Sequence, residues 1–196
     1  MIHDTKDEAY TNRLAKKSQS IWKNIFNVQA PYRFNLKRLD LGRVLDIGCG
    51  IGRNLANLDG NAVGIDHNVH SVEFSRSRGF EAYSPDEFFK KYGKSGQFDS
   101  ILVSHVLEHM DQKSALSLLA EYLPVLRTSG RVVLITPQEL GFRSDPTHVE
   151  YMNFAKLSDI AREAGLRVID QYSFPFPKFC GWFFKHNEHV VIAKKP

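Results

Sequence analysis

The sequence predicts an α/β domain with a mainly parallel sheet, on the strength of two observations. Short apolar runs alternate along the chain with longer segments of helical spacing. Residues 43–54 also have the pattern of a buried strand, a glycine turn and the start of a helix. The strand contains Val44, Leu45 and Ile47, an apolar run typical of an inner parallel strand. We expect one domain over residues 1–196, because no composition shift or low-complexity linker divides the chain.

The composition is ordinary for a globular protein, with 42% hydrophobic and 24% charged residues. The first residues lack the apolar core of a signal peptide, and no apolar run is long enough to span a membrane. A disulfide at Cys49 would obstruct the glycine turn, so we expect Cys49 and Cys180 to be reduced thiols. These features predict a cytoplasmic protein with no membrane partner. The net charge of +4 comes without a basic block, so we expect no nucleic-acid partner.

The glycine turn predicts a ligand site at the end of the first strand. Gly48, Gly50 and Gly52 let the backbone turn sharply and approach a ligand without a Cβ in the way. Dinucleotide sites use such turns too, but their pattern requires glycine where this chain has Arg53. Asp46 lies in the strand itself, and its charge suits a ligand that carries an ammonium group.

A second acidic residue follows the next apolar run. Residues 62–65 lead to Asp66, and an acid at the tip of this strand can accept hydrogen bonds from both hydroxyls of a ribose. Together with the glycine turn and the segment 98–110, this pattern resembles the class I S-adenosylmethionine-dependent methyltransferases, in their small-molecule, type 11-like branch. The resemblance covers residues 43–135 with specific motifs and the remainder loosely.

The resemblance implies a Rossmann-like doubly wound sheet of seven strands, mostly parallel with a C-terminal antiparallel strand pair, and helices on both faces. Residues 1–40 would form a helical cap, 43–135 the cofactor-binding half, and 136–196 the acceptor loop and C-terminal strands. The cofactor would be S-adenosyl-L-methionine, with S-adenosyl-L-homocysteine as product. Its expected contacts are Asp46, Gly48, Cys49, Gly50, Gly52, Asp66, His67, Ser84, Ser104, His105 and Arg33.

The N-terminal region is predicted to be helical over residues 4–27, which have an interrupted apolar stripe. In the resembled fold such a helix often lies over the cofactor, although it could also simply pack on the sheet. Pro31 is expected to break the helix. Arg33 could reach the methionine carboxylate of the cofactor or remain an exposed side chain.

The next helix is predicted between Asn68 as N-cap and Gly79 as stop, followed by a short strand at residues 80–83. Many members of the resembled family place adenine-contacting residues after this strand. Ser84 could serve there, but Ser84 and Glu87 also form the pattern of a capping box, with proline at the first helical position.

Within residues 98–110, Asp99 is predicted to open a strand whose residues 101–103 cross the core. Ser104 and His105 would then emerge at its carboxyl end, where open α/β sheets keep their chemistry. Methyltransferases that act on nucleic-acid bases carry Asn or Asp, two prolines and an aromatic residue at this point. The chain lacks that motif, which argues against base methylation.

The same segment has a second interpretation as a set of metal ligands. Small-RNA ribose methyltransferases use a Glu, a Glu-His pair and a later His, and this chain offers Glu108, His109 and His148. However, His105 stands where those enzymes have the first Glu, and the Glu-His pair is common in metal-free members. We therefore expect no metal.

The loop expected over residues 137–150 follows a predicted helix (112–126, its last turn tightened by Pro124) and a predicted strand (131–136). The loop is long and polar, and loops of this length in compact domains are usually functional. In the resembled fold it lies over the transferred methyl group, so it should contain the acceptor site.

His148 is the predicted general base for a hydroxyl acceptor, because histidine titrates near neutral pH. Its alternative role is to fasten the turn through Asp145. Glu139 or Asp145 could orient His148 or bind the acceptor directly, and His105 completes the candidate catalytic residues.

The C-terminal region predicts a helix over residues 153–164 and strands over 166–172 and 188–193. The connection between these strands, residues 173–185, contains five phenylalanines and a tryptophan, which exceeds what a hairpin needs. They could form a pocket wall suited to sugar rings, or cover the end of the sheet or a dimer partner.

The predicted activity is therefore methyl transfer to a small-molecule acceptor, through a hydroxyl of a sugar, a glycan precursor or a secondary metabolite. Two alternatives remain, an RNA methyltransferase and a non-catalytic S-adenosylmethionine-binding interaction protein. We expect a monomer or a homodimer.

Overall fold

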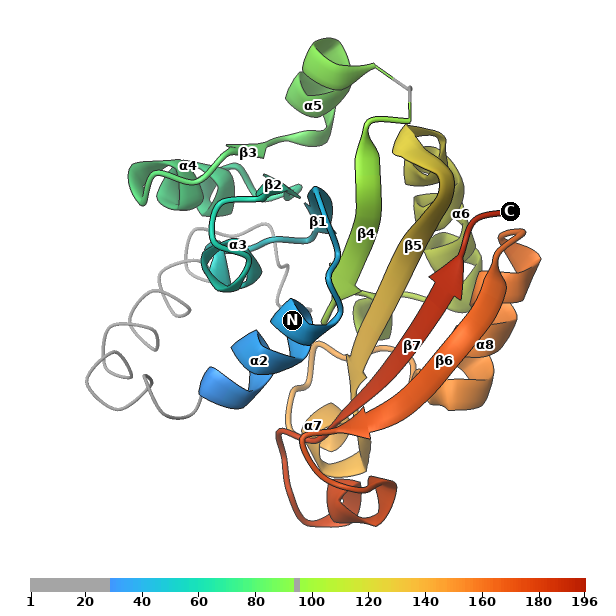
Figure 1. The fold of residues 1–196 in the computed structure, drawn as a ribbon. Coiled ribbons are helices and arrows are strands. Elements are labelled where there is room, and N and C mark those ends of the chain that lie inside the picture. The colour runs from blue at the N-terminus through green and yellow to red at the C-terminus, as the bar shows by residue number, and fades with distance from the viewer. Residues whose placement is uncertain (1–28, 94–95) are drawn as a thin grey trace. The chain divides into compact units, whose positions relative to one another are not determined.

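The computed structural model describes residues 29–93 and 96–196. Its seven strands form a mixed sheet in the order β3-β2-β1-β4-β5-β7-β6 (Figure 1). The sheet is mostly parallel with an antiparallel pair at the C-terminal end, which confirms the predicted fold class. The chain divides into two compact units, residues 1–91 and 92–196, and each is described by itself. The helix predicted over residues 4–27 lies outside the described residues.

The first unit contains three parallel strands in which buried aliphatic residues dominate: β1 (Val44–Ile47), β2 (Ala62–Ile65) and β3 (Ala82–Tyr83). Every residue of β1 and β2 is buried, as their apolar runs predict. The helices among its described residues are α2 (Ala30–Arg38), α3 (Arg53–Asn57), α4 (Val69–Ser77) and α5 (Pro85–Tyr92).

Local capping explains where two of these helices begin. The Asn68 side chain accepts hydrogen bonds from two amides of the first turn of α4, which confirms the predicted N-cap. At α5, the Ser84 amide donates to Glu87 Oε2 at 2.9 Å, and the Glu87 amide lies 3.4 Å from Ser84 Oγ, so the capping box is confirmed. Whether Pro31 breaks the helix predicted over residues 4–27 falls outside the described residues. Pro31 itself lies in the first turn of α2, where a missing amide proton costs nothing.

The second unit contains the remaining four strands: β4 (Phe98–Ser104), β5 (Leu126–Pro137), β6 (Arg167–Phe174) and β7 (Glu188–Lys194). Strands β4 and β5 are parallel, and β7 runs antiparallel to both β5 and β6. In this register Pro137, at the end of β5, faces Glu188, at the start of β7. The carboxyl ends of β4 and β5 and the first residues of β7 therefore lie at the same end of the sheet.

The helices of the second unit are α6 (Gln112–Tyr122), α7 (Glu139–Arg143) and α8 (Phe154–Glu163), with 3₁₀ turns η1 (Leu107–His109), η2 (Leu123–Val125) and η3 (Lys178–Trp182). Helix α8 packs on β6 and β7, and α6 packs on α8. The turn η2 confirms that Pro124 tightens the end of the preceding helix. The predicted loop at 137–150 is not wholly irregular, because it contains α7.

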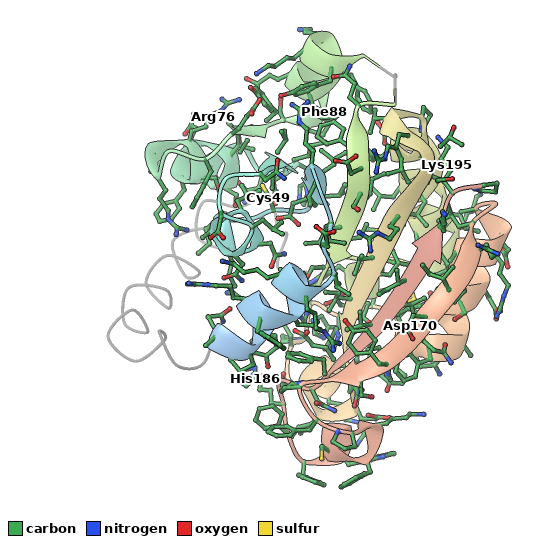
Figure 2. The ribbon with its side chains drawn as sticks, in the orientation of Figure 1. Cys49, Arg76, Phe88, Asp170, His186 and Lys195 are labelled. Carbon is green, nitrogen blue, oxygen red and sulfur yellow. The ribbon has the colours of Figure 1, made fainter. Side chains whose placement is uncertain are left out.

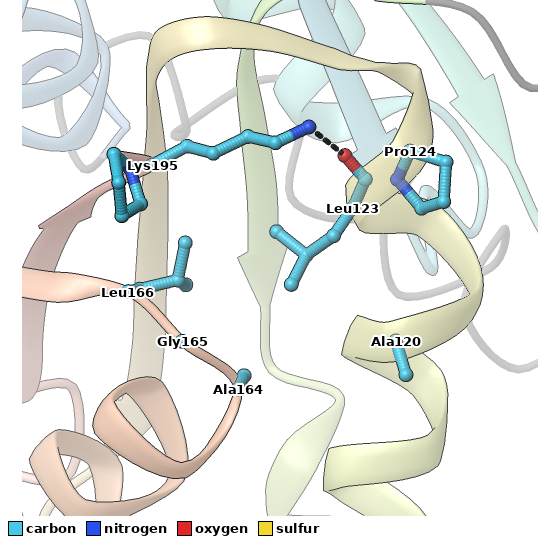
Figure 3. Close-up of a pocket in the computed structure, with 8 residues that line it drawn as sticks. Ala120, Leu123, Pro124, Ala164, Gly165, Leu166 and Lys195 are labelled. Carbon is cyan, nitrogen blue, oxygen red and sulfur yellow. Dashed lines mark hydrogen bonds between the residues drawn. The ribbon is translucent and has the colours of Figure 1, made fainter.

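A hollow lies at the opposite end of the second unit, where β5 begins (Figure 3). Its lining comes from the ends of α6 and α8 and from the C-terminus: Ala120, Leu123, Pro124, Ala164, Gly165, Leu166, Lys195 and Pro196. The Lys195 ammonium donates to the carbonyls of Leu123 and Leu126 at 2.8 and 2.7 Å. The hollow lies at the amino end of parallel strand β5, whereas ligands of such sheets bind at the carboxyl ends of the strands.

Among the described residues, no helix has the length and apolar character needed to cross a membrane.

Candidate functional site

The glycine turn between β1 and α3 has the conformation that its sequence predicts. Gly48, Gly50 and Gly52 have φ angles of +74°, +52° and +78°, a region that other residues rarely adopt. A Cβ built on Gly50 would meet nothing within 4 Å, so the turn presents bare backbone to open space. A Cβ on Gly52 would lie 2.7 Å from the Phe80 ring, because the turn packs closely there.

Asp66 holds this turn in place from the tip of β2. One carboxylate oxygen accepts a hydrogen bond from the Gly50 amide and the other from the Asn68 amide, both at 2.8 Å. Each oxygen keeps a second lone pair, so the side chain could also accept from the two hydroxyls of a ribose. His67 is exposed, with Nδ1 3.8 Å from Asp66 Oδ1.

Asp46 is the most unusual group of the first unit. Its side chain is fully buried, with Oδ1 3.4 Å from the Asn54 amide nitrogen and no partner for Oδ2. Burial raises the pKa of Asp46 to about 7, and the charge of Asp66 adds to this against the hydrogen bond from Asn54. A buried carboxylate oxygen without a partner is costly, and a cationic ligand would supply both the hydrogen bond and the opposite charge.

Three further predicted cofactor contacts of the first unit are Cys49, Ser84 and Arg33. Cys49 lies in the turn that precedes α3 (Figure 2), where burial and then the charges of Asp46 and Asp66 raise the pKa of its thiol. The thiol is therefore neutral, and Cys49 can contribute its backbone. Ser84 caps α5, and Arg33 is exposed on α2.

Three polar residues that support the turn were missed by sequence reasoning. Asn54 bonds Asp46, Ser75 Oγ donates to the Gly50 carbonyl at 2.9 Å, and Arg78 donates to the Ile51 carbonyl at 2.7 Å. Asn54 lies in the first turn of α3, directly after the glycine turn, and could have been found from this position. The other two come from α4 and its end, and no local pattern indicates them.

In the second unit, Ser104 ends β4 and His105 follows it with a φ of +58°, a strained value for a residue other than glycine. The His105 ring lies between two carboxylates. Its Nδ1 is 3.2 Å from Glu108 Oε1 and its Nε2 is 2.8 Å from Glu188 Oε1. Glu188 was missed, because it is 83 residues away in the sequence.

The two carboxylates determine the charge of His105. Partial burial by itself favours the neutral ring, but Glu108 and Glu188 outweigh it and raise the pKa of His105 to about 10. The ring is then an imidazolium at neutral pH, with both N–H groups donating to carboxylates. In this state His105 has no lone pair to accept a proton, which argues against a role as general base.

We expect the change Glu188→Gln to lower the pKa of His105 and to destabilise the protein in a pH-dependent way. Because the folded pKa is raised above 6.5, the stabilisation is complete below pH 6.5 and disappears as pH rises through about 10. The free energy of unfolding in urea should therefore differ most between variant and wild type near pH 6 and least near pH 10. Glu121→Gln, at an exposed residue of α6, is the control. A difference that stays constant over this range would contradict the assignment.

His148 lies after α7, half-buried, with its ring stacked on Phe142 at 5.3 Å between centroids. Its Nδ1 is 2.7 Å from the Phe142 carbonyl oxygen. A carbonyl only accepts, so Nδ1 carries a proton, and in the neutral ring Nε2 is therefore the nitrogen with the lone pair. The Asp145 carboxylate bonds Thr147 instead, so the orientation of His148 comes from the Phe142 backbone.

His109 has the same arrangement beside His148. Its Nδ1 is 3.1 Å from the Thr147 carbonyl, and the two imidazole rings meet edge to face at 4.9 Å. Burial lowers the pKa of His109. Glu108 is fully buried, and its Oε2 has no partner.

Glu108, His109 and His148 each bring one ligand atom into a group spanning at most 4.8 Å. Two imidazoles and a carboxylate are donors that zinc and other transition metals accept, so these residues could hold a metal ion. The sequence-based expectation of no metal stays a prediction.

Glu139 begins α7, and its Oε2 is buried without a partner. Burial, and then a hydrogen bond with Glu139, raise the pKa of Tyr151 above its ordinary value. The Tyr151 hydroxyl is also 3.1 Å from His189 Nε2. Glu139 therefore belongs to a Tyr151–His189 network and not to the hydrogen bonds of His148.

A family model described as a methyltransferase domain matches residues 14–171. The chain belongs to this family. The match confirms the predicted class I S-adenosylmethionine-dependent methyltransferase and, with it, the cofactor of the family. None of the curated proteins compared with this methyltransferase matched its sequence.

Solved structures similar to the methyltransferase share its fold. A SAM-dependent methyltransferase from Archaeoglobus fulgidus is 21% identical, with a TM-score of 0.67 over 84% of this chain and 93% of the other. A methyltransferase solved in complex with the Trm112 activator of Haloferax volcanii is 16% identical, with a TM-score of 0.71 over 98% and 100%. Magnesium protoporphyrin IX methyltransferase from Synechocystis PCC 6803, solved with bound SAM, is 12% identical, with a TM-score of 0.63 over 98% of each chain.

Proposed function

We propose that this methyltransferase transfers the methyl group of S-adenosylmethionine to a hydroxyl of a small-molecule acceptor, namely a sugar, a glycan precursor or a secondary metabolite. The observation that carries the proposal is the His148 ring, which keeps its Nδ1 proton on the Phe142 carbonyl and its Nε2 lone pair for an acceptor proton. A hydroxyl is the acceptor that needs such a base, because an amine or a thiolate can attack without one.

On the cofactor side, each proposed contact has a chemical reason. Asp46 would bind the ammonium of the methionine moiety, because its unpartnered Oδ2 requires a donor. Asp66 would accept from the ribose hydroxyls with the lone pairs that Gly50 and Asn68 leave available. The bare backbone of Gly50 allows the ligand to approach closely.

The transfer itself is an in-line displacement. The acceptor oxygen attacks the sulfonium methyl, an O–C bond forms as the S–C bond breaks, and the hydroxyl proton moves to Nε2 of His148. The sulfonium becomes the neutral thioether of S-adenosylhomocysteine. Alignment of the two reactants supplies much of the acceleration. Glu139 and Tyr151 are proposed to bind further hydroxyls of the acceptor, and His105 to hold Glu108 and Glu188 in place.

A screen of hydroxyl acceptors tests this function. The protein is incubated with S-adenosylmethionine and a panel of sugars, nucleotide sugars and phenols, and S-adenosylhomocysteine release is measured with and without EDTA. We expect turnover on a hydroxyl acceptor that EDTA leaves unchanged, because His148 is the base. Turnover only on amines, thiols or RNA would contradict the proposal. Loss with EDTA and recovery with a divalent ion would instead assign deprotonation to a metal at Glu108, His109 and His148.

A further inference from the structure

The connection between β6 and β7, residues 174–187, places large apolar side chains in solvent; we call it the aromatic loop. Its exposed members are Phe176 (47% exposed), Phe179 (65%), Trp182 (60%) and Phe183 (66%). In Figure 1 the loop is the orange-red segment that continues from the ends of β6 and β7 beside α7. The predicted pocket wall would bury these rings, but most of their surface is open.

The backbone of the aromatic loop is held in place, because one buried side chain forms hydrogen bonds at both of its ends. Asn187 is fully buried and donates to the carbonyls of Phe176 and Pro177 at 3.1 and 3.2 Å, and it accepts from the Phe176 amide at 2.9 Å. It also donates to Gln138 Oε1 at 2.9 Å, which ties the loop to the end of β5. The exposed rings therefore belong to a backbone that hydrogen bonds hold in place.

The middle of the loop is anchored as well. Gly181 lies so close to the end of β5 that a Cβ on it would come within 2.2 Å of Gln138 Oε1. The amides of Phe183 and Phe184 both donate to the Cys180 carbonyl, which closes the turn η3. With the backbone hydrogen-bonded and packed inward at Gly181, the side chains of Phe179, Trp182 and Phe183 are left facing outward.

The charged side chains of the aromatic loop itself have one sign. The aromatic loop contains Lys178, Lys185 and His186 and no acidic residue. Both lysines are exposed, and His186 lies at the same end of the unit (Figure 2). Arg143 of α7 lies over the Trp182 ring, 5.5 Å from its centroid. The loop therefore combines exposed aromatic rings with exposed cationic side chains.

We propose that the aromatic loop docks the protein on an anionic lipid surface. Phenylalanine and tryptophan enter the interfacial layer of a bilayer, while neighbouring lysine and arginine side chains pair with lipid phosphates. A protein partner or a second copy is less well matched, because the cores of protein interfaces are bordered by polar rims of mixed character. The proposal departs from the sequence-based expectation of no membrane partner.

Docking would also bear on the acceptor. The aromatic loop packs against α7, which begins the predicted acceptor loop. A lipid surface bound there would bring the acceptor loop near amphiphilic molecules, such as a glycan precursor on a lipid carrier. This last step rests on the proposed function, whereas lipid docking itself does not.

Vesicle binding tests the proposal without cofactor or acceptor, so its outcome is independent of the methyltransferase activity. The full chain is sedimented with vesicles of phosphatidylcholine alone or mixed with phosphatidylglycerol. We expect binding to the mixed vesicles, weakened by salt and at least about tenfold weaker for Phe179→Ser/Phe183→Ser and for Lys178→Glu/Lys185→Glu. In a Trp22→Phe background, Trp182 fluorescence should shift to the blue on binding.

Phe34→Ser is the matched control, because Phe34 is 65% exposed on α2 in the other unit. It should bind vesicles like wild type, and circular dichroism should show that all variants are folded. Absence of binding to the mixed vesicles, or equal binding by wild type and the loop variants, overturns the proposal. So does a dimer in light scattering that the loop variants abolish without any lipid binding, because the surface would then bind a second copy.

Discussion

The change Asp46→Asn is expected to stabilise the free protein while weakening S-adenosylhomocysteine binding by at least about a hundredfold. The carboxylate is fully buried with one oxygen unpartnered, so the folded chain bears its desolvation cost until a cationic ligand arrives. The isosteric amide removes the charge and with it the attraction for the ammonium of the ligand. The loss corresponds to about 3 kcal/mol, a usual value for a hydrogen bond to a charged group.

The raised pKa of Asp46 determines how the stability change of Asp46→Asn should vary with pH. The folded pKa of Asp46 is about 7, above the ordinary 3.8, so the carboxylate destabilises the fold only where it is ionised in the unfolded chain. The penalty is absent below pH 3.8 and complete above pH 7, where it amounts to about 4 kcal/mol at most. The gain from Asp46→Asn should therefore appear at pH 8 and vanish at pH 4.

Urea unfolding at these two pH values and calorimetric titration with S-adenosylhomocysteine measure both effects. Asp86→Asn, an exposed residue of α5, is the control and should change neither. Wild-type affinity in Asp46→Asn would remove Asp46 from the cofactor site. A loss of stability at pH 8 would mean that the carboxylate already has a favourable partner in the free protein.

The change His148→Gln is expected to lower kcat by about 10²–10⁴ while leaving cofactor affinity nearly unchanged, as is usual for loss of a general base. Glutamine fills a similar volume and can still donate to the Phe142 carbonyl, but it cannot take a proton at neutral pH. The ring contacts of His148 with Phe142 and His109 are lost in this variant, so its free energy of unfolding is measured as well.

Turnover on the acceptor found in the screen and titration with S-adenosylhomocysteine separate the two possible roles of His148. His186→Gln, an exposed histidine of the same unit, should retain wild-type turnover. If His148→Gln loses cofactor affinity and turnover together, with a lower free energy of unfolding, then the histidine fastens the turn. Unchanged turnover would remove it from the reaction.

Much of the first unit could be predicted from the sequence because its features are local. The apolar run of β1, the positive φ angles of the glycine turn and the acid at the tip of β2 lie within a few residues of one another. The capping box at Ser84 and Glu87 is likewise a pattern over four residues. Such patterns depend on backbone sterics and short-range hydrogen bonds, which residue identity alone determines.

The tertiary structure decided the charge of His105, the tautomer of His148 and the exposure of the aromatic loop. Glu188 reaches His105 only because β7 pairs antiparallel with β5 in one particular register. The Phe142 carbonyl is available to His148 only because α7 forms inside the predicted loop.

By itself, then, the sequence determined the fold class, the family and the turn that would hold the cofactor. The patterns that predict strands and turns each span only a few consecutive residues. It left open which groups meet across the sheet and which side chains face water. Those outcomes depend on packing between residues far apart in the sequence, and only the folded chain brings such residues together.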